Sequence, residues 1–149
     1  MNNTKTLAGV FISIFLVVVG AWLLIGPAES QSYVEIRNNR IEVQVAATVE
    51  EQIKGLSGRE SLPSDEGLLF VYESSGFQKF WMKDMNFPID IIWIGEDKTV
   101  VDITEDLHPE TYPRTFSPAQ PAQYVLEVNA GYTQEQGIIA GDYVTFDLN

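Results

Sequence analysis

Residues 80–95 read F-W-M-K-D-M-N-F-P-I-D-I-I-W-I-G, an apolar run that contains three charged side chains. Two Trp, four Ile, two Met and two Phe surround Lys83, Asp84 and Asp90. The segment M-N-F-P at 85–88 favours a turn, because Asn suits turns and Pro has no backbone donor for a central strand. The stretch therefore predicts two strands joined by a four-residue loop.

This predicted hairpin determines which side chains face each other. Alternation places Phe80, Met82 and Trp93 on one face of the hairpin. On the other face, Lys83 lies opposite Asp90 and Trp81 lies opposite Ile92, with directly opposed Cβ atoms about 5 Å apart. We therefore expect an ion pair between Lys83 and Asp90 beside an aromatic ring. Such a pair could stabilise the fold, at about 3–5 kcal/mol if broken when buried. It could equally form the base of an apolar pocket for a polar ligand, and both interpretations stay open.

Short alternating or continuous apolar segments indicate a mainly β fold. They predict strands at 33–37, 41–45, 67–72, 99–104, 124–129 and 143–148, with a turn at Asn38-Asn39 and a helical turn at 133–136 closed by Gly137. We expect a single compact small β-barrel or sandwich domain.

One short amphipathic helix is predicted at 49–57. Thr48 and Glu51 have the spacing of a capping box, in which each residue bonds the backbone of the other. Val49, Ile53 and Leu56 recur at the helical period and form one apolar face.

The N-terminal region contains an uncharged twenty-residue run at 7–26, preceded by a short tail at 1–6 and followed by a linker at 27–32. At about 1.5 Å per residue the run would span about 30 Å, the thickness of a bilayer core. We therefore expect an N-terminal transmembrane helix that anchors domain 33–149 in the lipid bilayer of the cytoplasmic membrane. Lys5 would stay inside and the domain would face outside, in the periplasm or cell exterior. The alternative is a secreted protein cleaved near Ser30.

Composition excludes several kinds of function. The chain has no Cys, 21 acidic residues and 9 basic residues. Omitting Lys5 and Glu29 leaves 20 acids and 8 bases, so residues 31–149 carry a net charge of −12. Such a charge repels phosphate backbones and argues against nucleic-acid binding. The lone His108 does not supply the three or four ligands of a zinc site, so we expect no metal and no cofactor.

Six ordered blocks resemble the domain of unknown function 192 family. They are G-L-S-G-R at 55–59, G-L-L-F-V at 67–71, F-W-M-K-D at 80–84, P-I-D-I-I-W-I at 88–94, V-L-E-V-N-A-G at 125–131 and G-D at 141–142. The third block departs from the family's usual F-W-M-K-N-T, because Asp84 and Met85 occupy its last two positions. The resemblance implies a compact, largely β domain, often behind an export signal or anchor. It supplies no established activity and no catalytic residues.

The ligand-binding candidates are residues of these blocks: Arg59, Trp81, Lys83, Asp90, Glu127 and Asn129. Without a strong catalytic constellation, we expect a non-catalytic accessory protein of the cell envelope that binds a small polar ligand or an envelope protein. The alternative is a glycosidase-like envelope hydrolase with Asp90 and Glu127 as its acid/base pair. The strand alternation places Glu127 and Asn129 on one face, and the hydrolase requires that this face also contain Asp90.

Overall fold

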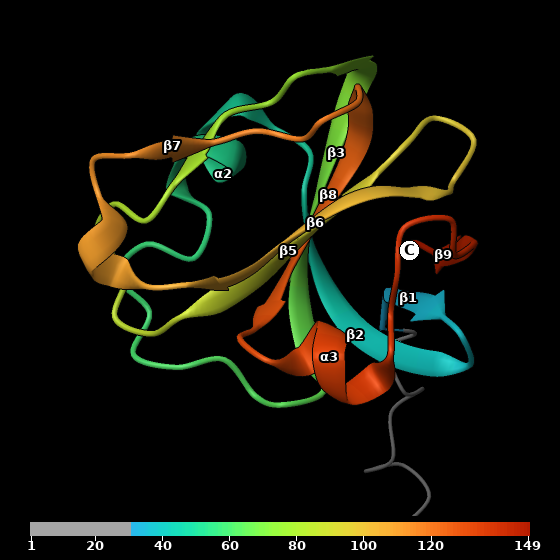
Figure 1. Ribbon diagram of the computed structural model, residues 1–149, viewed down its shortest axis with the longest axis horizontal. Helices are drawn as coiled ribbons and strands as arrows, with labels where there is room; N and C mark the ends of the chain where they lie inside the picture. The colour runs from blue at the N-terminus through green and yellow to red at the C-terminus, as the bar shows by residue number, and fades with distance from the viewer. Residues whose placement is uncertain (1–30) are drawn as a thin grey trace, which may run out of the picture. The chain divides into compact units, whose positions relative to one another are not determined.

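The computed structural model describes residues 31–149, which form a mainly β domain, as predicted (Figure 1). Its elements in chain order are β1 (Tyr33–Ile36), β2 (Asn39–Ala46), α2 (Val49–Lys54), β3 (Glu66–Gly76), β4 (Phe80–Trp81), β5 (Ile89–Ile94), β6 (Val100–Leu107), the 3-10 helix η1 (Pro109–Thr111), β7 (Thr115–Phe116), β8 (Ala122–Asn129), α3 (Tyr132–Gln136) and β9 (Val144–Asp147). The predicted anchor at 7–26 lies outside the described residues. Within residues 31–149, no helix has the length and apolar character to cross a membrane.

Seven strands form one strongly curled sheet in the order β6-β5-β8-β3-β2-β1-β9. All neighbouring pairs are antiparallel except β2 and β3. The two outer strands meet at one end, because Thr99 forms a bridge with Tyr143 and the Val144 amide donates to the Lys98 carbonyl at 2.8 Å. The sheet is therefore a half-barrel whose edges are joined where β6 and β9 begin.

Apolar side chains cover both faces of the central strands β3, β5 and β8. A barrel-side cluster includes Leu69, Ile92 and Leu126, together with residues of β1, β2, β6 and β9. An α2-side cluster on the opposite face includes Phe70, Trp93 and Val125, together with Leu56, Leu62, Phe80 and Met82. All six residues of β5 are buried. The continuous apolar pattern of β5 follows from this two-sided burial.

The predicted hairpin between 80–84 and 89–94 is wrong in its pairing. β4 pairs with β7, whereas β5 pairs with β6 and β8. The alternation itself is correct, since Phe80, Met82 and Trp93 all belong to the α2-side cluster. The observed pairing is favoured because β5 buries more surface between the long strands β6 and β8 than it could against the two-residue strand β4.

Two local turn predictions have different outcomes. The turn between β1 and β2 lies at Arg37 and Asn38, with φ of 51° and 66°, one residue before the predicted Asn38-Asn39. The helical turn near 133–136 is confirmed as α3, which ends at Gly137 with φ of 64°. Glycine adopts this left-handed conformation without steric cost, and the sequence signal was therefore reliable.

The predicted apolar face of the helix is wrong. The capping box of Thr48 and Glu51 is present, but α2 ends at Lys54 instead of residue 57. Val49 and Ile53 are 73% and 74% exposed, and of the three predicted residues only Leu56 is buried. Gly55, with φ of 50°, ends the helix and directs the chain so that Leu56 enters the core.

The polar residue Gln52 faces the sheet instead. Its side-chain amide donates to the carbonyls of Val71, at 2.9 Å, and Ala46, at 3.3 Å. The helix is therefore attached to β2 and β3 by hydrogen bonds, and two apolar side chains remain on its outer surface.

Candidate functional site

Asp90 is fully buried on the barrel side of β5, where it accepts three hydrogen bonds. Its Oδ1 accepts from the Asp106 amide at 2.9 Å, and its Oδ2 accepts from the Thr133 amide at 3.0 Å and the Thr133 hydroxyl at 2.7 Å. These donors come from the irregular part of β6 and the first turn of α3. Asp90 therefore holds the end of β6 and the start of α3 against the central sheet.

Lys83 does not form the expected ion pair. Its side chain is exposed, and no ion pair of Lys83 occurs within residues 31–149. The backbone carbonyl of Lys83 instead accepts from the Ser57 hydroxyl at 2.8 Å. The predicted pair is wrong because the β4–β5 hairpin that would have opposed these residues does not form.

Glu127 is the second buried carboxyl group of the sheet, but it lies on the other face and its Oε2 lacks a hydrogen-bond partner within residues 31–149. It lies between Leu68 of β3 and Ile91 of β5 on the α2 side, with 5% of its surface exposed. Its Oε2 is buried without a hydrogen-bond partner among the described residues. Buried carboxyl oxygens are normally paired, so an unpaired one requires an explanation.

Burial raises the pKa of Glu127 to about 8, and the positive charge of Arg59 opposes this rise. Removing a carboxylate from water disfavours its charged form, so Glu127 is predominantly neutral at pH 7. Burial, with a contribution from Glu127, also raises the pKa of Tyr72 to about 12. The α2 side of the sheet therefore holds a protonated carboxyl group that can donate a hydrogen bond.

The Glu127 carboxyl group lies at a small pocket of about 60 Å³ beside the end of α2. Its walls are Gln52, Ile53, Lys54, Gly55, Leu56, Ser57, Phe70, Tyr72, Lys79, Phe80, Trp81 and Glu127. A Cβ atom placed on Gly55 would be 4.0 Å from Oε2, which shows how closely this loop covers the carboxyl group. We call this cavity the Glu127 pocket.

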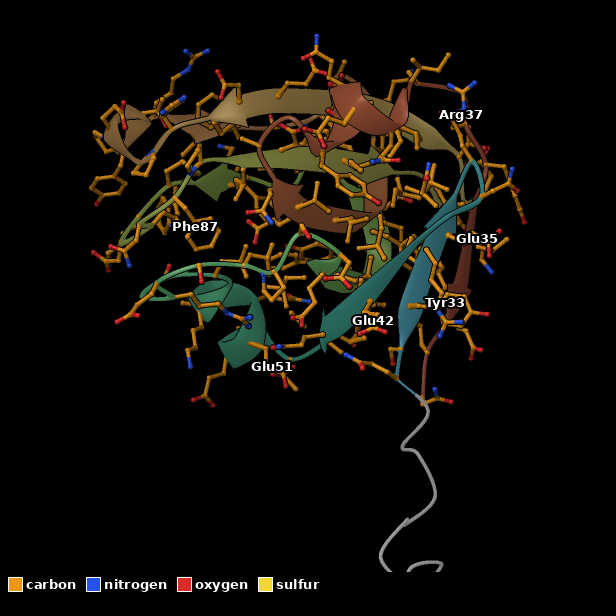
Figure 2. All side chains as sticks on the ribbon, turned by 90° about the horizontal axis from the view of Figure 1, so that it is seen from below. Tyr33, Glu35, Arg37, Glu42, Glu51 and Phe87 are labelled. Carbon is orange, nitrogen blue, oxygen red and sulfur yellow. The ribbon has the colours of Figure 1, made fainter. Side chains whose placement is uncertain are left out.

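A second pocket of about 200 Å³ shares Lys54 and Gly55 with the first. It is lined by Gln44, Val45, Ala46, Glu51, Lys54, Gly55, Arg59 and Leu68. Arg59 donates to the Gln44 side chain at 2.8 Å, which holds the guanidinium at this wall. Glu51, which also lines this pocket, lies on α2 (Figure 2) and participates in the capping box at the start of this helix. Both pockets therefore border the C-terminal end of α2.

Three of the six predicted ligand-binding residues, Arg59, Trp81 and Glu127, line these two pockets. Asn129 lies elsewhere, and its amide donates to the carbonyls of Leu62 and Pro63 and so supports the loop before β3. The strand register places Asp90 opposite Val128, one residue from Glu127, so the two carboxyl groups face opposite sides of the sheet. The structure therefore does not bring the proposed acid/base pair together.

Several residues of the pocket were missed by sequence reasoning. Lys54 and Lys79 carry no motif that distinguishes them from surface residues, and no sequence pattern assigned Gln52 or Tyr72 to a site. The one usable signal was Gly55 in G-L-S-G at 55–58, because a glycine can allow a close approach of the backbone, and here it lies against Phe70 and Glu127. No cluster of three or more metal-ligating side chains occurs in the part of the chain that the structure describes.

The fold and the pocket define a small half-barrel domain with a neutral carboxyl group at the base of a partly aromatic cavity. The family DUF192, described as "Uncharacterized ACR", matches residues 32–146. The chain therefore belongs to this family, as its sequence blocks indicated.

Solved structures also resemble this domain. A candidate transcription regulator from Sinorhizobium meliloti 1021 is 27% identical with a TM-score of 0.74, over 81% of this chain and 98% of that chain. A protein of unknown function from Novosphingobium aromaticivorans DSM 12444 is 31% identical with a TM-score of 0.70, over 81% of this chain and 90% of that chain. A search of curated proteins found no match.

The different environments of Asp90 and Lys83 lead to a stability prediction. Asp90→Asn replaces an acceptor oxygen with a donor and should lower the free energy of unfolding by at least about 2 kcal/mol, since hydrogen bonds to charged groups contribute about 1.5–3 kcal/mol each. Lys83→Met should stay within about 0.5 kcal/mol of the parent, as exposed substitutions usually do. Urea unfolding of the full chain in detergent measures both changes. Equal losses in the two variants would contradict these assignments.

The raised pKa of Glu127 leads to a pH prediction. The folded state holds a proton on Glu127 up to about pH 8, whereas the unfolded state releases it near the ordinary value of 4.5. This contribution to stability is therefore fully present below pH 4.5 and is lost as the pH rises from 4.5 to 8. Glu127→Gln, which cannot ionise, should gain stability relative to the parent by about 1.4 kcal/mol per pH unit within this window.

Urea unfolding from pH 5 to pH 8 tests this difference, with exposed Glu135→Gln as the matched control that should show no such trend. A difference between Glu127→Gln and the parent that does not change with pH would show that Glu127 ionises normally.

Proposed function

We propose that this chain is a membrane-tethered, extracytoplasmic domain that binds a small polar ligand in the Glu127 pocket. The observation that carries this proposal is the Glu127 carboxyl group, because Glu127 lines a cavity and its buried Oε2 has no hydrogen-bond partner in the domain. A ligand hydroxyl or amide would supply the missing hydrogen bond, and the polar side chains of the pocket, among them Gln52, Lys54 and Lys79, could orient such a ligand.

Binding is favoured over catalysis by the placement of the carboxyl groups. Glycoside hydrolysis requires two carboxyl groups on either side of the scissile bond, about 5–9.5 Å apart. Asp90 faces the barrel side of the sheet and is held by three donors, whereas Glu127 faces the α2 side. Glu51, the other acid at these pockets, accepts the hydrogen bonds of the capping box. A lone neutral carboxyl group suits recognition better than this reaction.

The proposed location rests on the uncharged run at 7–26, which is long enough for a bilayer core. Lys5 before it favours an inside N-terminus and a domain outside. The S. meliloti structure is described as a candidate transcription regulator. A net charge of −12 over residues 31–149 opposes contact with DNA phosphates, so we do not extend this role to the present chain.

A ligand panel tests the binding function. Thermal unfolding of the full chain in detergent would be followed with neutral sugars, sugar acids, amino acids and dicarboxylates. A ligand present at about 100 times its Kd should stabilise the domain by about 2.7 kcal/mol. Glu127→Leu should remove this response, and Glu135→Leu, which changes an exposed acid, should keep it.

The binding proposal fails if no compound of the panel stabilises the parent. It also fails if Glu127→Leu responds as strongly as the parent, because the ligand would then occupy another place.

The absence of native Cys allows a direct test of location. A membrane-impermeant maleimide should label Ser74→Cys, an exposed position of the domain, in intact cells. Asn2→Cys, in the predicted internal tail, should react only after the cells are lysed. Labelling of Asn2→Cys but not Ser74→Cys in intact cells would reverse the proposed orientation. Loss of the labelled domain into the medium would support cleavage near Ser30 instead.

A further inference from the structure

Positively charged residues gather around the Glu127 pocket in an otherwise acidic domain. Lys54 and Lys79 line this pocket, and Lys54 and Arg59 line the adjoining one. They are three of only 8 basic residues within 31–149, against 20 acidic residues. None of the three forms an ion pair with another described residue. Their charges therefore remain available for a ligand.

The acidic residues of the two pockets do not cancel this charge. Glu127 is neutral at pH 7 for the reasons given above. Glu51 is ionised, and hydrogen bonds from Thr48 and Ala47 lower its pKa. Its Oε2 accepts from the Ala47 amide, the Thr48 amide and the Thr48 hydroxyl, which hold it at the start of the helix. Its single negative charge leaves the three basic residues of the two pockets in excess. The pocket region is therefore locally positive and favours an anionic ligand.

The mouth of the Glu127 pocket offers a flat apolar surface. Trp81 is 53% exposed and packs edge-on against Tyr112, with ring centroids 6.4 Å apart. Ile53 is exposed on the end of α2 and lines the same pocket. An exposed Trp ring held by a second aromatic ring can stack against the apolar face of a ligand ring. The observed size of the pocket, about 60 Å³, admits only one substituent of such a ring.

We propose that the ligand is a sugar bearing a carboxylate, of the uronic acid type. One ring hydroxyl enters the pocket and bonds Glu127, the carboxylate lies between the ammonium groups of Lys54 and Lys79, and the ring packs on Trp81. This inference rests on the proposed binding function and names the ligand class of the same site.

The carboxyl proton of Glu127 makes this binding depend on pH. The charged or titratable groups around it are Arg59, Lys54, Lys79 and Tyr72. Ionisation of Glu127 removes a donor and adds a negative charge beside an anionic ligand. Affinity should fall as the pH rises through about 8.

Calorimetric titration of the full chain in detergent at pH 7 tests the ligand class with three probes. Methyl glucuronide combines the ring and the charge, methyl glucoside has the ring alone, and acetate has the charge alone. The glucuronide should bind at least about tenfold more tightly than the glucoside, since charge-assisted hydrogen bonds are stronger than neutral ones. Acetate should bind more weakly still.

Single substitutions test the proposed contacts of the ligand with Lys79 and with Glu127 separately. Lys79→Gln should weaken glucuronide binding about tenfold and leave the glucoside unchanged. Lys98→Gln, in the turn between β5 and β6, is the matched control and should change neither. Glu127→Gln keeps a neutral donor, so it should retain glucuronide binding at pH 7. It should also remove the loss of about tenfold that the parent shows between pH 7.5 and pH 9.

Three results would overturn the ligand class while the binding function stands. The first is equal binding of glucoside and glucuronide, with Lys79→Gln changing neither. The second is acetate binding as tight as glucuronide binding. The third is no binding of any probe although another panel compound stabilises the parent and not Glu127→Leu. If no panel compound stabilises the parent, the binding function and the ligand class fail together.

Discussion

β8 lies between β3 and β5, and apolar clusters cover both of its faces. Leu126 joins Leu69 and Ile92 on the barrel side, and Val125 joins Phe70 and Trp93 on the other. Because both faces are covered by buried apolar side chains, a polar side chain on these three strands needs a hydrogen-bond partner within the protein or on a ligand. The two carboxyl groups of Asp90 and Glu127 are subject to this constraint and meet it in different ways.

The Asp90 carboxylate is satisfied by the chain itself. Its three donors come from Asp106 and Thr133, which are 16 and 43 residues distant in sequence, and they position the end of β6 and the start of α3. Asp106 has a φ of 53° at this point, so the bond is made where the strand departs from regular geometry. A buried charge with enough donors acts as a structural attachment between elements. The presence of the charged residue Asp90 in the apolar stretch at 80–95 is therefore explained by its structural role.

The sequence correctly predicted features that depend on neighbouring residues, such as side-chain alternation and helix caps. It failed to predict features that depend on residues distant in sequence, such as strand pairing. Alternation placed Phe80, Met82 and Trp93 on one face, Thr48 and Glu51 formed their capping box, and Gly137 ended α3. The same alternation also fits a β4–β5 hairpin, because a period of two does not specify which strand lies alongside. Of the two true partners of β5, β8 begins 28 residues after the end of β5, and its contribution depends on the total burial of the sheet.

Helix α2, which borders the candidate site, shows the same limit of prediction from sequence. Three apolar residues at helical spacing indicated a buried face, yet Gly55 ends the helix before Leu56 and leaves Val49 and Ile53 exposed. That early end brings the 55–57 loop over the Glu127 carboxyl group and brings Lys54 to both pockets. The candidates Arg59, Trp81 and Glu127 were recognised by motif position, but their meeting point depends on this turn.

Glu127 has no such structural attachment, although it occupies a similar depth in the same sheet. A Leu or Met side chain of similar volume would bury apolar surface in the row between Leu68 and Ile91 without an unpaired oxygen. Core stability alone therefore favours an apolar residue at this position. Unfavourable buried groups of this kind are typical of sites where function limits stability. A ligand bound in the cavity that Glu127 lines could supply the missing hydrogen bond, and the basic side chains around the cavity could contact the same ligand.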